Sequence, residues 1–150
     1  MKLNQQFRDI LREEGMRHTW QRQAIWDEIK STDEHRDADD IFLGLKQAGY
    51  PISRATVYRT IDVLVSHGLV RKLDIGEGRM RLEHKLDSQH HDHLICENCG
   101  RIIEFVNPEI EALQSEISTA HGFALSHHVH QLFGRCLAYP DCEYYRSQNR

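Results

Sequence analysis

Apolar residues recur every three or four positions through four successive segments in the first half of the chain. This is the spacing of helices that each bury one face. Polar capping residues precede three of the segments, and glycines follow three of them. The pattern predicts helices over Asn4–Glu14, after Thr19, from Asp37 to Gly49 and over Arg54–His67.

Two short extended runs follow the fourth of these helices. They cover Leu69–Ile75 and Arg79–Glu83, and the turn Gly76-Glu77-Gly78 between them is a hairpin signal. Three helices, a further helix with an exposed polar face and then a hairpin are typical of a winged helix-turn-helix.

The pattern changes in the second half of the chain. Two β-prone runs, 92–95 and 101–105, flank a tight turn, and a helix is expected to begin at Pro108 and end at Gly122. Alternating apolar residues predict a strand over Phe123–Phe133, and the last eight residues are polar and expected to be frayed. The predicted fold class is α+β, with a winged-helix DNA-binding domain at 1–84, a hinge at 85–89 and a small α/β domain at 90–150.

Charge and composition support this division. The net charge of the 150-residue chain is −4, but residues 1–82 carry +1 and residues 83–150 carry −5. Eight of the eleven histidines lie between His84 and His130. No apolar run is long enough to span a bilayer and no signal peptide is evident, so we expect a cytoplasmic protein without a membrane partner. In that reducing compartment, four cysteines favour metal binding over disulfides.

Metal-binding side chains are concentrated in residues 90–99, which hold three histidines, one aspartate and two cysteines. An expression tag would lie at a terminus and would lack the interleaved residues. In a strand, neighbouring side chains point to opposite faces. His91 and His93 would then share one face, with His90 and Asp92 on the other, so one segment could serve two separate metal sites.

Cys96 and Cys99 have the spacing of a zinc knuckle, in which two thiolates bind one ion across a tight turn. A single pair of this kind is also compatible with a redox function. Cys136 and Cys142 supply a second pair, and this favours a structural Zn²⁺.

The predicted helix at 54–67 has the features of a DNA-reading helix. Val57, Ile61, Leu64 and Val65 form a buried stripe, which leaves Ala55, Tyr58 and Arg59 facing outward. Arg59 could pair with a guanine, while Tyr58 and Ala55 could pack against thymine methyl groups.

Other basic residues nearby are suited to positioning a duplex. Arg17 could enter a narrow minor groove or hold a phosphate, and Arg54, Arg71 and Lys72 are candidate phosphate contacts. Two other interpretations remain open, because such a face can simply be solvated and helix-turn-helix shapes also serve as protein-docking modules.

Several motifs together resemble the ferric uptake regulator family, over a region from about Phe7 to Cys142. They are the sequence Ser-Arg-Ala-Thr-Val-Tyr-Arg at 53–59, the stretch 90–100, Ile103-Glu104-Phe105 with Glu111 after it, and Thr19-x-Gln21-Arg22. The resemblance implies a dimeric, metal-activated transcription regulator with an N-terminal winged helix and a C-terminal α/β dimerisation domain.

The resemblance also implies three metal sites. The regulatory sensor site would comprise His35, Glu83, His91, His93 and Glu104. An additional site would comprise His90, Asp92, Glu111 and His128. The structural zinc would be bound by Cys96, Cys99, Cys136 and Cys142. Arg17, Tyr58 and Arg59 match the family's DNA-contacting positions.

The sensor ligands narrow the choice of metal. Zinc sensors of the family have a cysteine in the regulatory site, whereas this chain has none before Cys96, and peroxide sensors have aspartates in place of Glu83 and Glu104. Imidazoles mixed with carboxylates suit Fe²⁺ or Mn²⁺, and Zn²⁺ can occupy such a site in vitro. We favour iron, with manganese second.

The sequence therefore predicts an Fe²⁺-activated repressor that binds a palindromic DNA operator and controls iron-uptake and metal-homeostasis genes. It would act as a homodimer or higher oligomer and take no small-molecule substrate. The alternatives are a manganese-, zinc- or peroxide-responsive regulator of the same family and, from other classes, a zinc metalloenzyme or a zinc-dependent docking module. An enzyme is not favoured, because the chain has no His-Glu-x-x-His motif and five protein ligands would leave little room for substrate.

Overall fold

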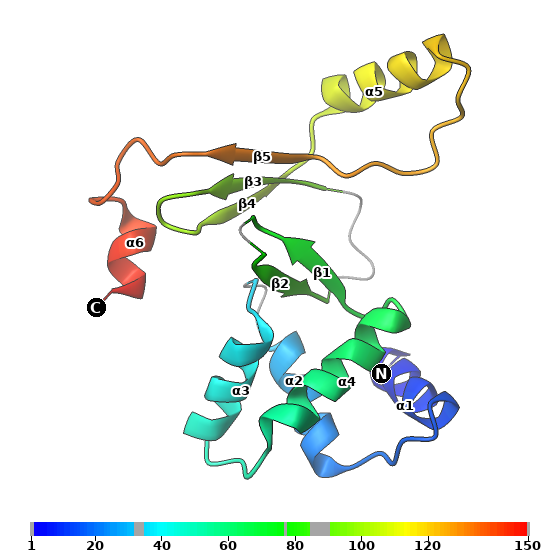
Figure 1. Cartoon of the computed structure of the whole chain (residues 1–150), viewed down its shortest axis with the longest axis vertical. Coiled ribbons are helices and arrows are strands. Elements are labelled where there is room, and N and C mark those ends of the chain that lie inside the picture. Colours follow the sequence, from blue (N-terminus) through cyan, green and yellow to red (C-terminus); the bar gives the residue numbers. More distant parts are fainter. Residues whose placement is uncertain (1, 32–34, 77, 85–90, 150) are drawn as a thin grey trace. The chain divides into compact units, whose positions relative to one another are not determined.

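The computed structural model describes residues 2–31, 35–76, 78–84 and 91–149 (Figure 1). The chain divides into two compact units, 1–87 and 88–150. The predicted hinge at 85–89 lies outside the described residues and stays a prediction. No helix in the described ranges is both long and apolar enough to cross a membrane.

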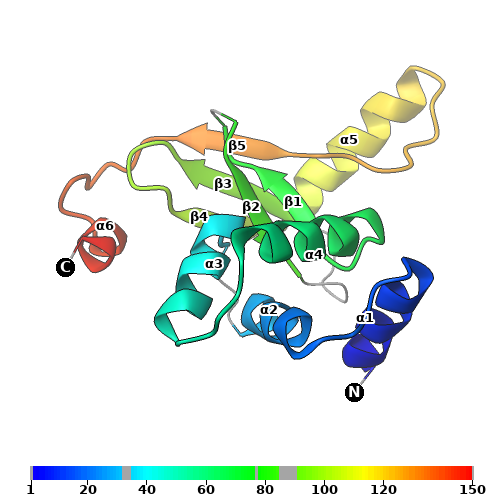
Figure 2. The same cartoon turned by 60° about the horizontal axis from the view of Figure 1, so that its bottom comes forward.

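The first unit consists of four helices and a β-hairpin. The helices are α1 (Lys2–Glu13), α2 (Trp20–Lys30), α3 (Ala38–Gln47) and α4 (Arg54–Ser66). Strands β1 (Arg71–Asp74) and β2 (Met80–Glu83) then pair antiparallel to form the wing. Helix α4 packs against the other three helices, as Figure 2 shows, so the unit is a winged helix.

The helix starts follow from capping. Ser53 Oγ accepts a hydrogen bond from the backbone N–H of Thr56 at 3.1 Å. Asp37 and Asp40 form a reciprocal capping box at the start of α3. After α4, Gly68 has φ +69°, a conformation that favours glycine. The boundaries predicted for these helices therefore agree with the structure to within one or two residues.

One large apolar core holds the first unit together. Phe7 stacks on Trp26 with ring centroids 5.7 Å apart, and both side chains are fully buried. The indole N–H of Trp26 donates to Asn4 Oδ1 at 3.0 Å, so its one polar atom is satisfied. Helix α4 contributes Val57 and Leu64 to this core.

The second unit is built on a three-stranded sheet with the order β4-β3-β5. Its elements are β3 (Asp92–Cys96), β4 (Ile102–Phe105), α5 (Pro108–Ala120), β5 (Gln131–Gly134) and α6 (Glu143–Gln148). Strand β3 pairs antiparallel with β4 and parallel with β5. Helix α5 extends away from the sheet (Figures 1 and 2).

The strand predicted over Phe123–Phe133 is wrong for most of its length, because only Gln131–Gly134 forms a strand. Residues His93–Cys96 of β3 pair with β5 and offer partners to those four residues only. Phe123 and Val129 are 72% and 82% exposed, so their alternation does not reflect burial within one chain.

The tail was also predicted wrongly. Residues expected to be frayed form α6, with Cys142 at its N-cap position. The rings of Tyr139 and Tyr145 meet edge to face, with centroids 4.9 Å apart, and this contact ties the helix to the preceding loop.

Candidate functional site

One face of β3 gathers two histidines and a carboxylate. The rings of His91 and His93 lie 5.0 Å apart, and His93 pairs directly with Glu104 of β4 in the strand register. His91 Nε2 is 3.6 Å from Glu104 Oε1. The alternation expected from the sequence is thus present, and these three side chains form the α/β-unit half-site.

The first unit positions His35 and Glu83 by a short backbone contact. Arg36 and Leu82 form an isolated antiparallel bridge, in which the N–H of Leu82 donates to the carbonyl of Arg36 at 2.7 Å. His35 and Glu83 are the next pair in that register and so lie side by side. We call them the winged-unit half-site.

A salt bridge that sequence reasoning missed supports this arrangement. The guanidinium of Arg36 donates from Nη1 to Glu28 Oε1 at 2.7 Å, and both side chains are largely buried. Arg36 is thereby fixed to α2 while its backbone holds β2. Nothing in the spacing of Glu28 and Arg36 signals the pair, because it depends on the packing of α2 against the loop before α3.

The opposite face of β3 holds a second cluster. Asp92, Glu111 and His128 each offer a ligand atom within 4.8 Å of the others. His128 Nε2 is 3.5 Å from Asp92 Oδ1 and 3.4 Å from Glu111 Oε1. His90, which was predicted to join this set, lies outside the described residues.

His130 is a further member that sequence reasoning did not include. Its Nδ1 lies 3.2 Å from Oδ2 of Asp92, whose side chain is almost completely buried. The carbonyl of His130 also accepts the N–H of His93 at 3.2 Å, at the point where β5 joins the sheet. The spacing could have found it, because His128 and His130 are two residues apart in a predicted strand and such positions share a face.

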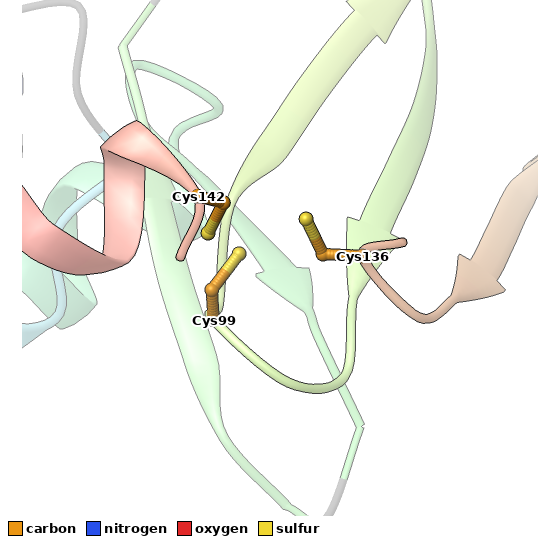
Figure 3. Close-up of side chains that lie close together, drawn as sticks. All are labelled: Cys99, Cys136 and Cys142. Carbon is orange, nitrogen blue, oxygen red and sulfur yellow. The ribbon is translucent and has the colours of Figure 1, made fainter. Parts of the chain in front are cut away.

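The cysteines meet at the end of the second unit that carries the β3–β4 turn. The sulfurs of Cys99, Cys136 and Cys142 lie within 4.8 Å of one another and point together in Figure 3. Zn–S bonds of about 2.3 Å in a tetrahedron place the sulfurs roughly 3.8 Å apart, so small shifts would accommodate the ion. All four cysteines are free thiols.

Cys96 borders this group. Its sulfur accepts the backbone N–H of Cys136 at 3.2 Å. Burial opposes ionisation of Cys96, but donors from Cys99, Asn98 and Cys136 outweigh it and lower the pKa of this thiol. Burial and, to a smaller extent, interactions with the neighbouring thiols of Cys96 and Cys142 together raise the pKa of Cys99 to about 11, although the backbone of Arg101 acts in the opposite direction. Thiolate sulfurs are the ligands that soft metal ions prefer, and a bound cation favours the deprotonated form of each thiol. The cysteine cluster therefore suits a soft metal ion.

The predicted DNA-reading residues stand on one exposed face of α4. Arg54, Ala55, Tyr58 and Arg59 are all exposed, whereas Val57 between them is fully buried. Arg17 is exposed in the loop before α2, where its carbonyl accepts a hydrogen bond from Arg22 at 2.6 Å. Partial desolvation and the neighbouring Asp39 carboxylate both raise the pKa of Tyr58 above its ordinary value, and its hydroxyl is a protonated donor at neutral pH.

A winged helix followed by a small α/β unit with His-carboxylate and cysteine clusters defines a class, the metal-responsive regulators of transcription. The chain matches the model of the ferric uptake regulator family over residues 13–133 and belongs to that family. Members of the family are DNA-binding regulators rather than enzymes.

Relatives and solved structures agree with this assignment. The chain is 38% identical to the ferric uptake regulation protein of Campylobacter jejuni over 136 residues, which cover 89% of this chain and 86% of the relative. The Helicobacter pylori ferric uptake regulator Fur, described as having three functional metal-binding sites, superposes with a TM-score of 0.85 at 27% identity. That match covers 95% of this chain and 94% of the other.

The iron-containing ferric uptake regulator of Francisella tularensis gives a TM-score of 0.77 at 33% identity. The match covers 83% of this chain and 94% of the Francisella tularensis chain. These matches confirm the predicted family and α+β fold class. The assignment of individual ligands and DNA contacts stays a prediction.

Proposed function

We propose that this protein is a cytoplasmic, Fe²⁺-activated repressor. It binds a palindromic operator as a dimer and controls genes of iron uptake. The observation that carries the proposal is the pair of half-sites. Each unit, taken by itself, brings together the members of the predicted sensor set that it contains: His35 with Glu83, and His91 and His93 with Glu104.

The donor chemistry favours iron or manganese. The combined set has three imidazoles and two carboxylates, a borderline-to-hard combination with no thiolate. Zinc binds such ligands more tightly in isolation, so the supply of metal in the cell would select the resident ion. Iron in the F. tularensis relative supports Fe²⁺ as the first choice, with Mn²⁺ second.

The half-sites suggest how metal controls DNA binding. An ion that takes ligands from both units would restrict them to one relative orientation. A dimer must present its two recognition helices about 34–36 Å apart to read successive major grooves. Fixing the orientation of the units fixes this spacing, and an almost complete switch requires roughly ten-thousand-fold tighter metal binding to the competent state.

We further propose that Cys96, Cys99, Cys136 and Cys142 bind a structural Zn²⁺. The clustering of three of the sulfurs and the contact between Cys96 and the N–H of Cys136 support this. Asp92, Glu111 and His128 are proposed as ligands of a further site, beside which His130 orients the aspartate.

The exposed apolar face of the second unit supports a dimer. Leu113 and Ile117 on α5 are 56% and 61% exposed, and Phe123 and Val129 beyond it are more so. Exposed apolar side chains of this size in one small unit are of the kind expected at the interface of a homodimer.

Replacing Ile117 by aspartate is therefore expected to convert the dimer to monomers, because the charge would have to be buried in an apolar interface. Sedimentation equilibrium measures the change. Glu116→Gln, at the neighbouring exposed position, is the control and should stay dimeric. A dimer of unchanged stability in Ile117→Asp would place the interface elsewhere.

Arg59→Ala is expected to weaken operator binding by about 1–3 kcal/mol if Arg59 reads a base. The same change should relax the base preference at one position in each half of the palindromic operator, which selection from a random duplex pool would reveal. Arg12→Ala, which removes an exposed arginine of α1, serves as the control for lost charge. An equal loss on all sequences would instead make Arg59 a phosphate contact.

The proposed function itself is tested by the same selection, run with and without Mn²⁺. Recovery of a palindromic duplex only in the presence of the metal is the expected result. Recovery of the same duplex at the same affinity without metal would refute metal activation.

A further inference from the structure

Asp39, the second residue of α3, holds two side chains of the exposed face of α4 with a single oxygen. Its Oδ1 accepts hydrogen bonds from the guanidinium of Arg54 and, at 3.1 Å, from the hydroxyl of Tyr58. Both partners are predicted DNA contacts. A carboxylate therefore lies within the surface that is proposed to face the negatively charged duplex.

Arg54 is restrained by more than this ion pair. Its guanidinium carbon lies 4.7 Å from the centroid of the Phe42 ring. Arg54 and Tyr58 are four residues apart on α4 and so occupy the same side of the helix. The ion pair is nevertheless accessible, since the side chains of Arg54 and Asp39 are 55% and 48% exposed. A phosphate can compete for the arginine, because exposed ion pairs are weak.

We propose that Asp39 is a specificity-determining residue, which weakens binding to unrelated DNA by engaging Arg54 and supports operator binding by positioning Tyr58. Sequence-independent affinity comes from Lys and Arg side chains that neutralise phosphates and release counterions. Arg54 joins them only after it leaves Asp39, and the negative charge of the carboxylate then faces the phosphates without the neutralising guanidinium.

At the operator the same carboxylate has the opposite effect. By accepting a hydrogen bond from the hydroxyl of Tyr58, Asp39 holds the ring in one orientation toward the base edges, and the Arg54 ion pair can persist. Asp39 thus lowers the affinity for unrelated DNA more than the affinity for the operator. Because α4 is proposed to read DNA, this role rests on the proposed function.

The test compares the wild-type protein with Asp39→Asn and with a control, Asp27→Asn. Asp27 is an exposed aspartate of α2 that pairs with Lys30 at 2.8 Å, so its substitution makes the same change in charge away from α4. Two probes are used with Mn²⁺ present: a duplex selected by the wild-type protein from a random pool, and a scrambled duplex of the same composition. Affinity is measured by fluorescence anisotropy over a range of KCl concentrations.

Asp39→Asn is expected to bind the scrambled duplex about threefold more tightly, with a salt slope steeper by about 0.9, the effect of one added phosphate contact. Its affinity for the selected duplex should rise less or fall, so the ratio of the two affinities decreases. Asp27→Asn should leave the ratio at the wild-type value. An unchanged or increased ratio in Asp39→Asn would overturn the proposal.

Tyr58→Phe separates the two effects, because it keeps the ring and the Arg54 ion pair but removes the hydroxyl. We expect weaker binding to the selected duplex and no gain on the scrambled one. If Tyr58→Phe gained as much affinity for the scrambled duplex as Asp39→Asn, release of Arg54 would not be the cause of the gain, and the proposal would be overturned. If the wild-type protein itself does not prefer the selected duplex, the proposed function fails, which is a different result from an unchanged Asp39→Asn.

Discussion

Replacing Cys99 by serine is expected to release the structural zinc and unfold the second unit. The physical reason is the small core of that unit. In the part of the chain that the structure describes, Ile95 is the only hydrophobic side chain of the second unit that is buried, whereas the first unit buries more than a dozen. Too little apolar surface is removed from water for the sheet to be stable by itself.

Zinc would supply the missing stability by joining distant parts of the second unit. Cys99 lies in the turn after β3, while Cys136 follows β5 and Cys142 precedes α6. Structural zinc in small peptides contributes about 10–16 kcal/mol of binding free energy, most of which is folding free energy. Loss of one thiolate should therefore remove several kcal/mol.

Two measurements check this expectation. Metal analysis of dialysed protein should find one tightly held zinc per chain in the wild type and none in Cys99→Ser. Far-UV circular dichroism should record an early melting transition that is absent from the wild type, while the helical first unit still melts separately. A Cys99→Ser protein that keeps its zinc and melts like the wild type would sink the assignment.

Replacing His91 by alanine is expected to abolish metal-stimulated DNA binding while leaving the zinc and the dimer intact. His91 is within 3.6 Å of Glu104 and beside His93, and it precedes β3, whereas the cysteine turn follows the other end of that strand. The loss can approach the roughly ten-thousand-fold range of a complete switch, because without one ligand the ion no longer favours one orientation of the units strongly.

His121→Ala is the matched control, since it removes an exposed imidazole at the end of α5. It should respond to Mn²⁺ like the wild type. If His91→Ala kept the wild-type affinity and metal dependence, the sensor would be the cluster of Asp92, Glu111 and His128, together with His90.

Local sequence rules predicted the first unit well, and the reason is visible in its elements. Each helix carries its own signals, such as the Ser53 cap of α4 and the glycine after it, and its apolar stripe faces a core made by the same chain. The exposed positions of Tyr58 and Arg59 follow directly from that stripe.

The second unit was predicted less well, because its order depends on partners that are distant in sequence. Phe123 and Val129 alternate like strand residues, yet β3 offers no backbone partner that far from β5. Their exposure is consistent with packing against a second chain. Helix α6 has no apolar stripe, so it was missed, although Glu143 in its first turn and Arg146 in its last are favourable end charges.

The candidate sites divide in the same way. The alternation of His91 and Asp92 and the Cys96–Cys99 turn are local features, and the sequence alone predicted them. The roles of His35 and Glu83 came only from the family resemblance, since their pairing depends on the bridge between Arg36 and Leu82. The Arg54–Asp39 pair joins α4 to α3, so it depends on how the two helices pack and cannot be predicted from the spacing of the residues.

Metal activation is tested most directly by an anaerobic titration of zinc-containing, otherwise metal-free protein with Fe²⁺ or Mn²⁺ in the presence of a fluorescent operator duplex. Anisotropy should rise and saturate with either metal, a scrambled duplex should show no comparable rise, and His91→Ala should show none with either duplex. Operator binding of equal affinity before and after addition of the metals would contradict metal activation.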